Sequence, residues 1–112
     1  MKYMLQIIGF AGAEFAEGEG PTAEEFVAYQ QALVEAGVHV DGGFLGDFTL
    51  ATSVQVDRTG RRVVTNGPFP ETREYLGGWD VLDVPDLDAA LEWAARSPGA
   101  RYGRVEVRPV MG

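Results

Sequence analysis

The chain has 112 residues, a formal net charge of −8 and no cysteine. This length predicts a single domain over residues 1–112, with enough buried surface for a hydrophobic core. The absence of cysteine excludes disulfide bonds, thiolate metal sites and cysteine nucleophiles, and it fits a cytoplasmic location. An acidic protein repels phosphate backbones, so we expect no nucleic-acid partner.

The excess negative charge lies in the first half of the sequence. Up to Asp57 there are nine acidic residues and one basic residue, whereas from Arg58 onward there are eight of each. The apolar stretch Met1–Ile8 is too short for a signal peptide or for a membrane span, which needs about 20 apolar residues. We therefore expect a soluble protein without a membrane partner.

The first 45 residues predict a strand, a helix and a second strand. Lys2–Ile8 is apolar and predicts a buried strand. After an acidic loop, Thr22 and Glu25 form the pattern of a capping box, in which each side chain bonds the other residue's amide at a helix start. Apolar residues then recur at helical spacing until Gly37, which is placed to end the helix in the left-handed conformation. Val38–Leu45 predicts a strand, and its glycine pair indicates a bulge or a close backbone approach.

The remaining residues predict a hairpin, a strand, a helix and a last strand. Ala51–Val56 alternates in polarity and Arg61–Thr65 returns after a turn, which is typical of a hairpin. Leu76–Val84 predicts another strand. Asp86 is placed to cap a second helix that Ser97-Pro98-Gly99 stops, and Gly103–Val110 alternates as a half-buried strand.

This order of elements predicts an α+β fold. It is a ferredoxin-like sandwich, with two helices on one face of a mainly antiparallel sheet. Two helices cover only one face, so the other face needs a partner. We therefore expect an isologous homodimer in which the second sheet faces cover each other.

The segment Asn66–Glu74, NGPFPETRE, resembles the Asp-Gly-Pro-Phe-x-Glu-Thr-Lys-Glu signature of the YCII-related (DGPF) proteins. Further similar segments are Met1–Leu5, Leu76–Trp79, Asp83–Asp88, Ala90–Ala94 and Val105–Val110. The resemblance implies a ferredoxin-like dimer, similar to the dimeric α+β barrels that include muconolactone isomerase. Some DGPF proteins are linked with extracytoplasmic-function sigma factors, so the resemblance also implies a sigma-factor system as a partner.

Two positions depart from the signature, since Asn66 stands where the family has Asp and Arg73 where it has Lys. If the family's Asp is a general base, this chain lacks that base. If the Asp bonds the turn backbone, Asn serves equally well. A His–Asp pair proposed as the active site in the YCII branch has its His on the first helix. That pair does not carry over, because the helix Glu24–Glu35 contains no histidine.

His39 is the only histidine, which excludes a multi-histidine metal site within one chain. On a strand, His39 and Asp41 point to the same face, and a carboxylate beside an imidazole can orient it as a general base. The pair is thus a candidate catalytic pair. The alternative is a histidine that is exposed or satisfied within the core.

Glu71 and Glu74 lie three residues apart after the turn and are also candidate catalytic residues, because neighbouring carboxylates can divide acid and base roles. Alternatively, they pair with Arg73, Arg61 or Arg62 as surface ions. Together with Asn66, these three arginines are candidate ligand-binding residues, since guanidinium groups bind carboxylates and phosphates through paired bonds.

Two functions remain open from the sequence. The first is a dimer that binds a small anionic or polar metabolite, with lyase or isomerase activity by proton transfer. We expect no cofactor, because the sequence lacks nucleotide-binding, nucleophile-elbow and zinc motifs. The second is a non-catalytic regulatory or interaction module associated with a sigma-factor system. Its motivating feature is the acidic segment Gly9–Gly20, which could become ordered on binding.

Overall fold

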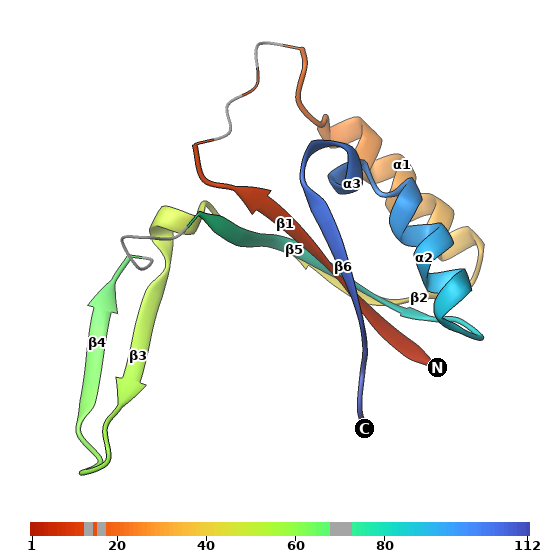
Figure 1. The fold of residues 1–112 in the computed structure, drawn as a ribbon. Helices are drawn as coiled ribbons and strands as arrows, with labels where there is room; N and C mark the ends of the chain where they lie inside the picture. Colours follow the sequence, from red (N-terminus) through yellow and green to blue (C-terminus); the bar gives the residue numbers. More distant parts are fainter. Residues whose placement is uncertain (13–14, 16–17, 68–72) are drawn as a thin grey trace.

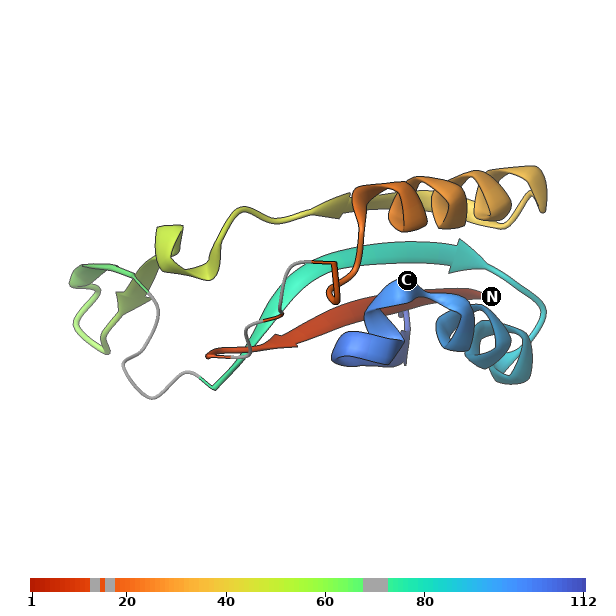
Figure 2. The ribbon, with the colours of Figure 1, turned by 90° about the horizontal axis from the view of Figure 1, so that it is seen from above.

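The computed structural model describes residues 1–12, 15, 18–67 and 73–112. Its body is a four-stranded sheet of order β2-β5-β1-β6 in which every neighbouring pair is antiparallel. The helices lie together on one face of this sheet (Figures 1 and 2). The fold is therefore α+β and compatible with a ferredoxin-like arrangement. The sheet consists of β1 (Lys2–Phe10), β2 (His39–Phe44), β5 (Glu74–Asp83) and β6 (Arg104–Pro109).

Helix α1 (Ala23–Glu35) begins and ends where the sequence predicts. The Thr22 hydroxyl accepts the Glu25 amide hydrogen at 3.1 Å, and Gly37 has a φ of 72°. The sequence also predicts that the Glu25 side chain bonds the Thr22 amide. This prediction is wrong, because the Glu25 carboxylate forms an ion pair with Arg101 instead. A long-range cation therefore replaces the local backbone bond.

Helix α2 (Leu87–Arg96) is capped by Asp86, whose carboxylate accepts the Ala89 amide hydrogen at 2.9 Å. The sequence prediction that Ser97-Pro98-Gly99 only stops this helix is incomplete. Ser97 is buried and starts a further short helix, α3 (Pro98–Tyr102), by accepting the Gly99 amide hydrogen at 3.3 Å. Proline at the first position of a helix suits this restart, since its missing amide hydrogen would have no partner there.

The hydrophobic core lies between the helices and the sheet. Leu33 of α1 and Leu82 of β5 are fully buried, and Leu5 of β1 is 1% exposed. The Tyr29 hydroxyl crosses this layer to donate to the Trp93 carbonyl oxygen at 2.8 Å. Burial and the nearby charge of Asp80 raise the pKa of Tyr29, so its hydroxyl keeps its proton and the hydrogen bond.

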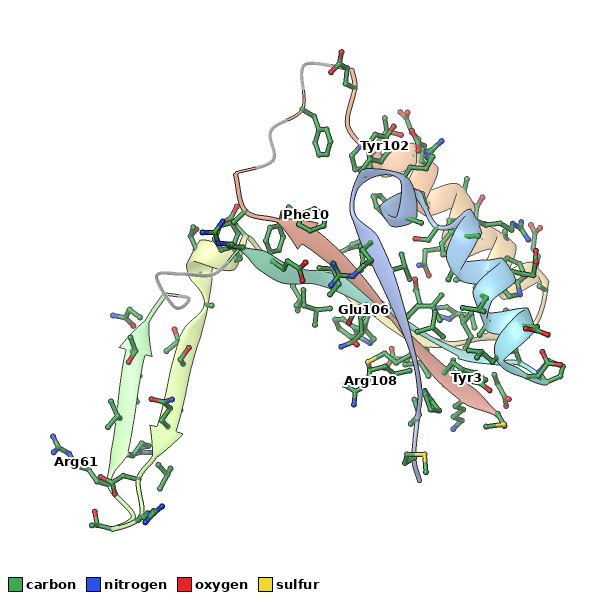
Figure 3. The ribbon with its side chains drawn as sticks, in the orientation of Figure 1. Tyr3, Phe10, Arg61, Tyr102, Glu106 and Arg108 are labelled. Carbon is green, nitrogen blue, oxygen red and sulfur yellow. The ribbon has the colours of Figure 1, made fainter. Side chains whose placement is uncertain are left out.

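Within the described ranges, no helix lies on the opposite face of the sheet. Polar side chains from β6 line this face, and Glu106 and Arg108 point away from the helices in Figure 3. No helix in the described part of the chain is long and apolar enough to span a membrane.

Strands β3 (Thr52–Val56) and β4 (Arg62–Asn66) form a separate two-stranded hairpin, which we call the arm. The arm extends beyond the end of the sheet and bends toward the side away from the helices (Figures 1 and 2). A short 3-10 helix, η1 (Phe48–Leu50), lies at the base of the arm and contacts the main sheet. Phe48 stacks on Tyr75 of β5 with ring centroids 4.7 Å apart. Among the residues that the structure describes, β3 and β4 form hydrogen bonds with each other and none with the four-stranded sheet.

Candidate functional site

A bulge in β2 determines where its side chains point. His39 pairs with Leu82, but Asp41 pairs with Val81, so the register shifts at Val40. His39 therefore faces the helices, whereas Asp41 faces the uncovered side of the sheet. The expectation that His39 and Asp41 share a face is wrong, because the extra residue of a bulge reverses the alternation of side chains.

His39 lies instead beside Asp80, a residue that the sequence reasoning missed. Gly42 pairs with Asp80 across β2 and β5. A Cβ atom at Gly42 would lie 2.5 Å from Asp80 Oδ1 and 3.4 Å from His39 Nε2, so these two atoms flank the same small space. Only a glycine leaves that space open. The glycine pair in β2 thus marks a close approach, as the sequence predicts.

Asp80 is almost completely buried, at 1% exposure. Gln30 of α1 donates a hydrogen bond from Nε2 to Asp80 Oδ1 at 2.7 Å. Burial raises the pKa of Asp80, although the Gln30 hydrogen bond and the charge of His39 act in the opposite direction. A carboxyl group in such a setting holds its proton more tightly than one in water.

The His39 imidazole has an unused polar atom. His39 Nε2 is buried and has no hydrogen-bond partner among the described residues. Buried polar atoms are nearly always bonded, so an unpartnered one calls for a functional explanation. An imidazole nitrogen beside a carboxyl group is suited to accept or donate a proton.

A groove of about 760 Å³ opens on the outer side of α1 next to this cluster. Phe26 of α1 and Phe44 of β2 meet edge to face, 5.1 Å apart, and form one wall. Gln30 lines the groove and also bonds Asp80, so it connects the groove with the buried cluster. The other lining residues are mainly apolar: Ala23, Val27, Gln31, Val34 and Glu35.

Only the two ends of the signature loop, up to Gly67 and from Arg73, are described. Gly67 has a φ of 89°, and its amide donates to the Ala51 carbonyl oxygen at 2.6 Å, which closes the base of the arm. Asn66 is the last residue of β4 and is followed directly by this turn. Glu71 lies outside the described residues. Arg73 is exposed, and its carbonyl oxygen accepts the Ala11 amide hydrogen at 2.6 Å.

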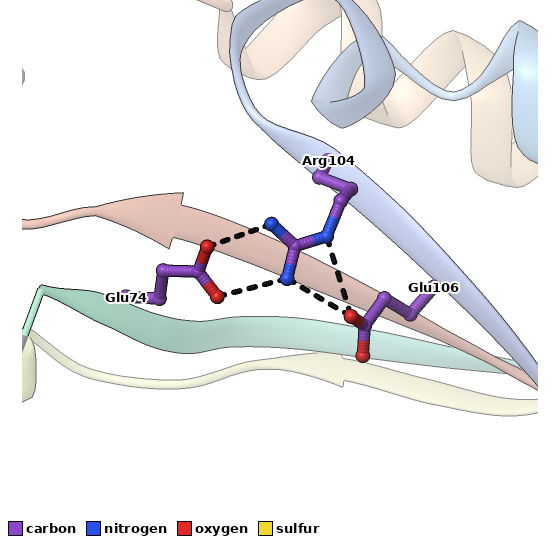
Figure 4. A network of polar contacts seen from close by, with 3 residues as sticks. All are labelled: Glu74, Arg104 and Glu106. Atoms are coloured by element: carbon purple, nitrogen blue, oxygen red, sulfur yellow. Dashed lines mark hydrogen bonds and ion pairs between the residues drawn. The ribbon is translucent and has the colours of Figure 1, made fainter.

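Glu74 forms an ion pair, but with a cation that the sequence did not indicate. Arg104 donates from both terminal nitrogens to the Glu74 carboxylate, at 2.7 and 2.8 Å, and also contacts Glu106 at 2.9 Å (Figure 4). The hydrogen bonds from Arg104 lower the pKa of Glu74. Glu74 therefore stays ionised and its oxygens are occupied, which suits a structural anion better than an acid–base group.

The expected arginine cluster is divided between two places. Arg61 lies at the far end of the arm, as Figure 3 shows, and Arg62 begins β4 beside it. Arg73 immediately precedes β5, on the other side of the loop. Within one chain the arm thus carries Arg61 and Arg62 away from His39 and Asp80. The described residues include no group of three or more His, Cys, Asp or Glu side chains that could hold a metal ion.

Two sequence signals point to the residues that were missed. Asp80 alternates with Leu82 of β5 and with Val84 just after the strand, so it occupies an inward position on an otherwise apolar face. Gln30 follows Phe26 by four residues and precedes Val34 by four, which places it on the same side of α1. Neither signal shows that the two side chains meet.

We expect Asp80→Asn to raise the melting temperature near pH 8 and to flatten its pH dependence. Because burial raises the pKa of Asp80, the folded state binds this proton more tightly than the unfolded chain does. The contribution of this proton to the free energy of unfolding is fully present below the pKa that Asp80 has in the unfolded chain. It is lost as the pH rises through the pKa of Asp80 in the folded protein. Asn keeps an oxygen for Gln30 without ionising. The gain should be about 1 kcal/mol, or roughly 4 °C.

Thermal unfolding followed by circular dichroism between about pH 5 and pH 8 measures this effect. Asp83→Asn is the matched control, because Asp83 is on the same strand but its side chain is 60% exposed. Identical pH profiles for wild type and Asp80→Asn would show that the Asp80 carboxyl group has no unusual proton affinity.

Comparison with known proteins places these observations in a family. The sequence model of the YCII-related domain matches residues 1–112. An uncharacterised protein of Rhizobium meliloti (strain 1021) is 36% identical over 85 residues, which cover 74% of this chain and 68% of the relative. The match to the family agrees with the resemblance carried by the signature loop.

Proposed function

We propose that this chain, which belongs to the YCII-related domain family, is a homodimer that binds a small organic molecule and moves a proton on it. The observation that carries the proposal is the closeness of the Asp80 carboxyl group to His39 Nε2, which is buried and has no hydrogen-bond partner in the described part of the chain, beside an apolar groove. The reaction class is that of a lyase or isomerase. Such a reaction needs acid and base groups but no redox partner.

The two titratable groups are suited to different roles. His39 Nε2, which has no hydrogen-bond partner among the described residues, can accept a proton from a carbon atom of a ligand that reaches it past Gln30, and the imidazole can return that proton to a neighbouring atom. Asp80, with a raised pKa, is suited to hold the imidazolium in place or to donate a hydrogen bond in its protonated form. Gln30 fixes one oxygen of Asp80 and leaves its own carbonyl oxygen for the groove.

The groove favours a ligand with an apolar body and a polar end. Phe26, Val27 and Phe44 supply apolar walls, while Gln30 supplies the polar group at the point nearest Asp80. Pockets of about 300–1,000 Å³ are typical for small molecules, and this groove falls in that range. The homodimer is supported by the face of the sheet that no helix covers.

Thermal-shift screening with small carboxylic acids and phosphorylated metabolites tests the binding site. We expect a compound that raises the melting temperature of the wild-type protein by several degrees. Its effect should be lost in His39→Asn and in Gln30→Ala. Asp88→Ala on the exposed surface of α2 serves as a control that keeps it.

Arg73→Ala separates the two candidate sites. If the thermal shift depends on Arg73 and not on His39, the signature loop binds the ligand and the site proposed here is wrong. If no compound of either class stabilises the protein, the non-catalytic interaction module becomes the better account of this chain.

A further inference from the structure

The arm exposes apolar side chains that its own body does not cover. Val54 is 57% exposed, Val56 65% and Val64 57%. Val54 pairs with Val64, and Val56 pairs with Arg62, so the three valines and Arg62 lie on one face of the arm. We call this face the valine face. Ser53 and Thr65 pair on the opposite face.

A two-stranded hairpin of this kind is at best marginally stable alone in water. It needs a third strand or a packed surface to hold its shape, and the described part of its own chain supplies neither along β3 and β4 (Figure 1). Contiguous exposed apolar side chains on a small protein usually mark a contact with another molecule. The valine face therefore requires an occupant.

The groove beside α1 matches the valine face in chemistry. Its exposed apolar residues include Val27 at 57%, Val34 at 61% and Phe44 at 59% exposure. Glu35 lies at the edge of the groove, and Arg62 lies on the valine face, so the charges are complementary.

The length of the arm allows this contact between two copies of the chain. Five-residue strands extend about 17 Å, and two packed sheets lie about 10 Å apart. The arm bends toward the uncovered face of the sheet, where the second copy of the proposed dimer would lie (Figure 1). The arm therefore extends past the partner's sheet and toward the layer of its helices.

We propose that the arm of each protomer packs its valine face over the open side of the groove between α1 and β2 of its partner. Arg62 then lies near the partner's Glu35, and the arm closes the outer side of the groove that leads to Gln30 and Asp80. The ligand site is incomplete without the partner. This inference rests on the homodimer proposed above, but not on the chemistry of His39.

Cysteine cross-linking tests the contact directly, because the chain has no cysteine of its own. In a double variant, Val27→Cys with Val56→Cys, mild oxidation should give a disulfide-linked pair of chains on a denaturing gel. A dimer of either single variant has one thiol at each of its two symmetry-related contacts, too far apart to form a disulfide. Each single variant should therefore give at least about tenfold less of the cross-linked product. Equal cross-linking in the single and double variants would overturn the proposed placement of the arm.

Charged substitutions on the two faces of the arm provide a matched comparison. Val54→Asp with Val64→Asp should weaken dimerisation by about 100-fold in analytical ultracentrifugation, since it buries two charges in an apolar contact. Ser53→Asp with Thr65→Asp, on the opposite face, should change it by less than about fivefold. Circular dichroism checks that the body of each variant remains folded.

The outcomes distinguish a failure of the arm contact from a failure of the homodimer on which it rests. A wild-type protein that stays a 12.1 kDa monomer at micromolar concentration overturns both the homodimer and the arm contact. A dimer that Val54→Asp with Val64→Asp leaves intact overturns the arm contact alone. Loss of ligand-induced stabilisation in that same variant, with dimerisation lost, supports the closure of the groove by the partner.

Discussion

Gly42→Ala is expected to destabilise the protein by about 3 kcal/mol, an effect at the upper end for one added methyl group in a packed interior. The new Cβ would lie 2.5 Å from Asp80 Oδ1 and 2.9 Å from the Trp79 carbonyl oxygen. The second of these atoms belongs to the backbone of β5, which pairs with β1 on one side and β2 on the other. Neither neighbour can withdraw without breaking strand pairing or the Gln30–Asp80 hydrogen bond.

The same substitution should also abolish ligand-dependent stabilisation, because it fills the space between His39 and Asp80. Urea unfolding at about pH 7 measures the first effect, and the thermal-shift assay measures the second. Gly46→Ala is the matched control, since its nearest atom, Leu50 Cδ1, would be 3.4 Å from the new methyl group. A Gly42→Ala protein that is as stable as the control would show that the space beside Asp80 is not tightly bounded.

Leu33→Ala is expected to destabilise the protein by about 3 kcal/mol, the usual range for removing most of a buried leucine side chain. Leu33 is fully buried in the core formed by α1, α2 and the sheet. Leu33 also lies three residues after Gln30. Its packing in the core therefore sets the distance between α1 and the sheet at which Gln30 reaches Asp80.

Leu91→Ala is the natural comparison for Leu33→Ala, because it removes the same atoms from a leucine of α2 that is 46% exposed and lies outside the groove, so its truncation should cost less than about 1 kcal/mol. Urea unfolding of the two variants measures the difference in free energy of unfolding. If both variants lose the same stability, α1 does not pack on the sheet as described, and the position assigned to Gln30 loses its support.

Local sequence patterns predicted most of the fold. The caps at Thr22 and Asp86 and the left-handed Gly37 depend on bonds to nearby residues, so their signals are contained in short segments. The strands follow from alternation or from short apolar runs. The arm was predicted as a hairpin. Its departure from the main sheet was not, because that depends on which strands pair over long distances.

The candidate site was predicted only in part, for a related reason. His39 was identified as a lone histidine on a strand, but its partner was assigned by counting residues, and the bulge at Val40 changes that count. Asp80 and Gln30 are 50 residues apart, and Glu74 and Arg104 are 30 apart. Spacing along a chain does not reveal such contacts, since they exist only once the sheet and helices have packed.

The central claim is that the ligand site is at His39, Gln30 and Asp80 and not at the signature loop. Because His39 is the only histidine, its imidazole gives a single set of ring signals in a proton–carbon correlation NMR spectrum. Titration with the compound that raises the melting temperature most should shift the His39 ring signals and the Gln30 side-chain amide signals together. Shifts confined to Asn66 and Arg73, with His39 and Gln30 unchanged, would contradict the claim.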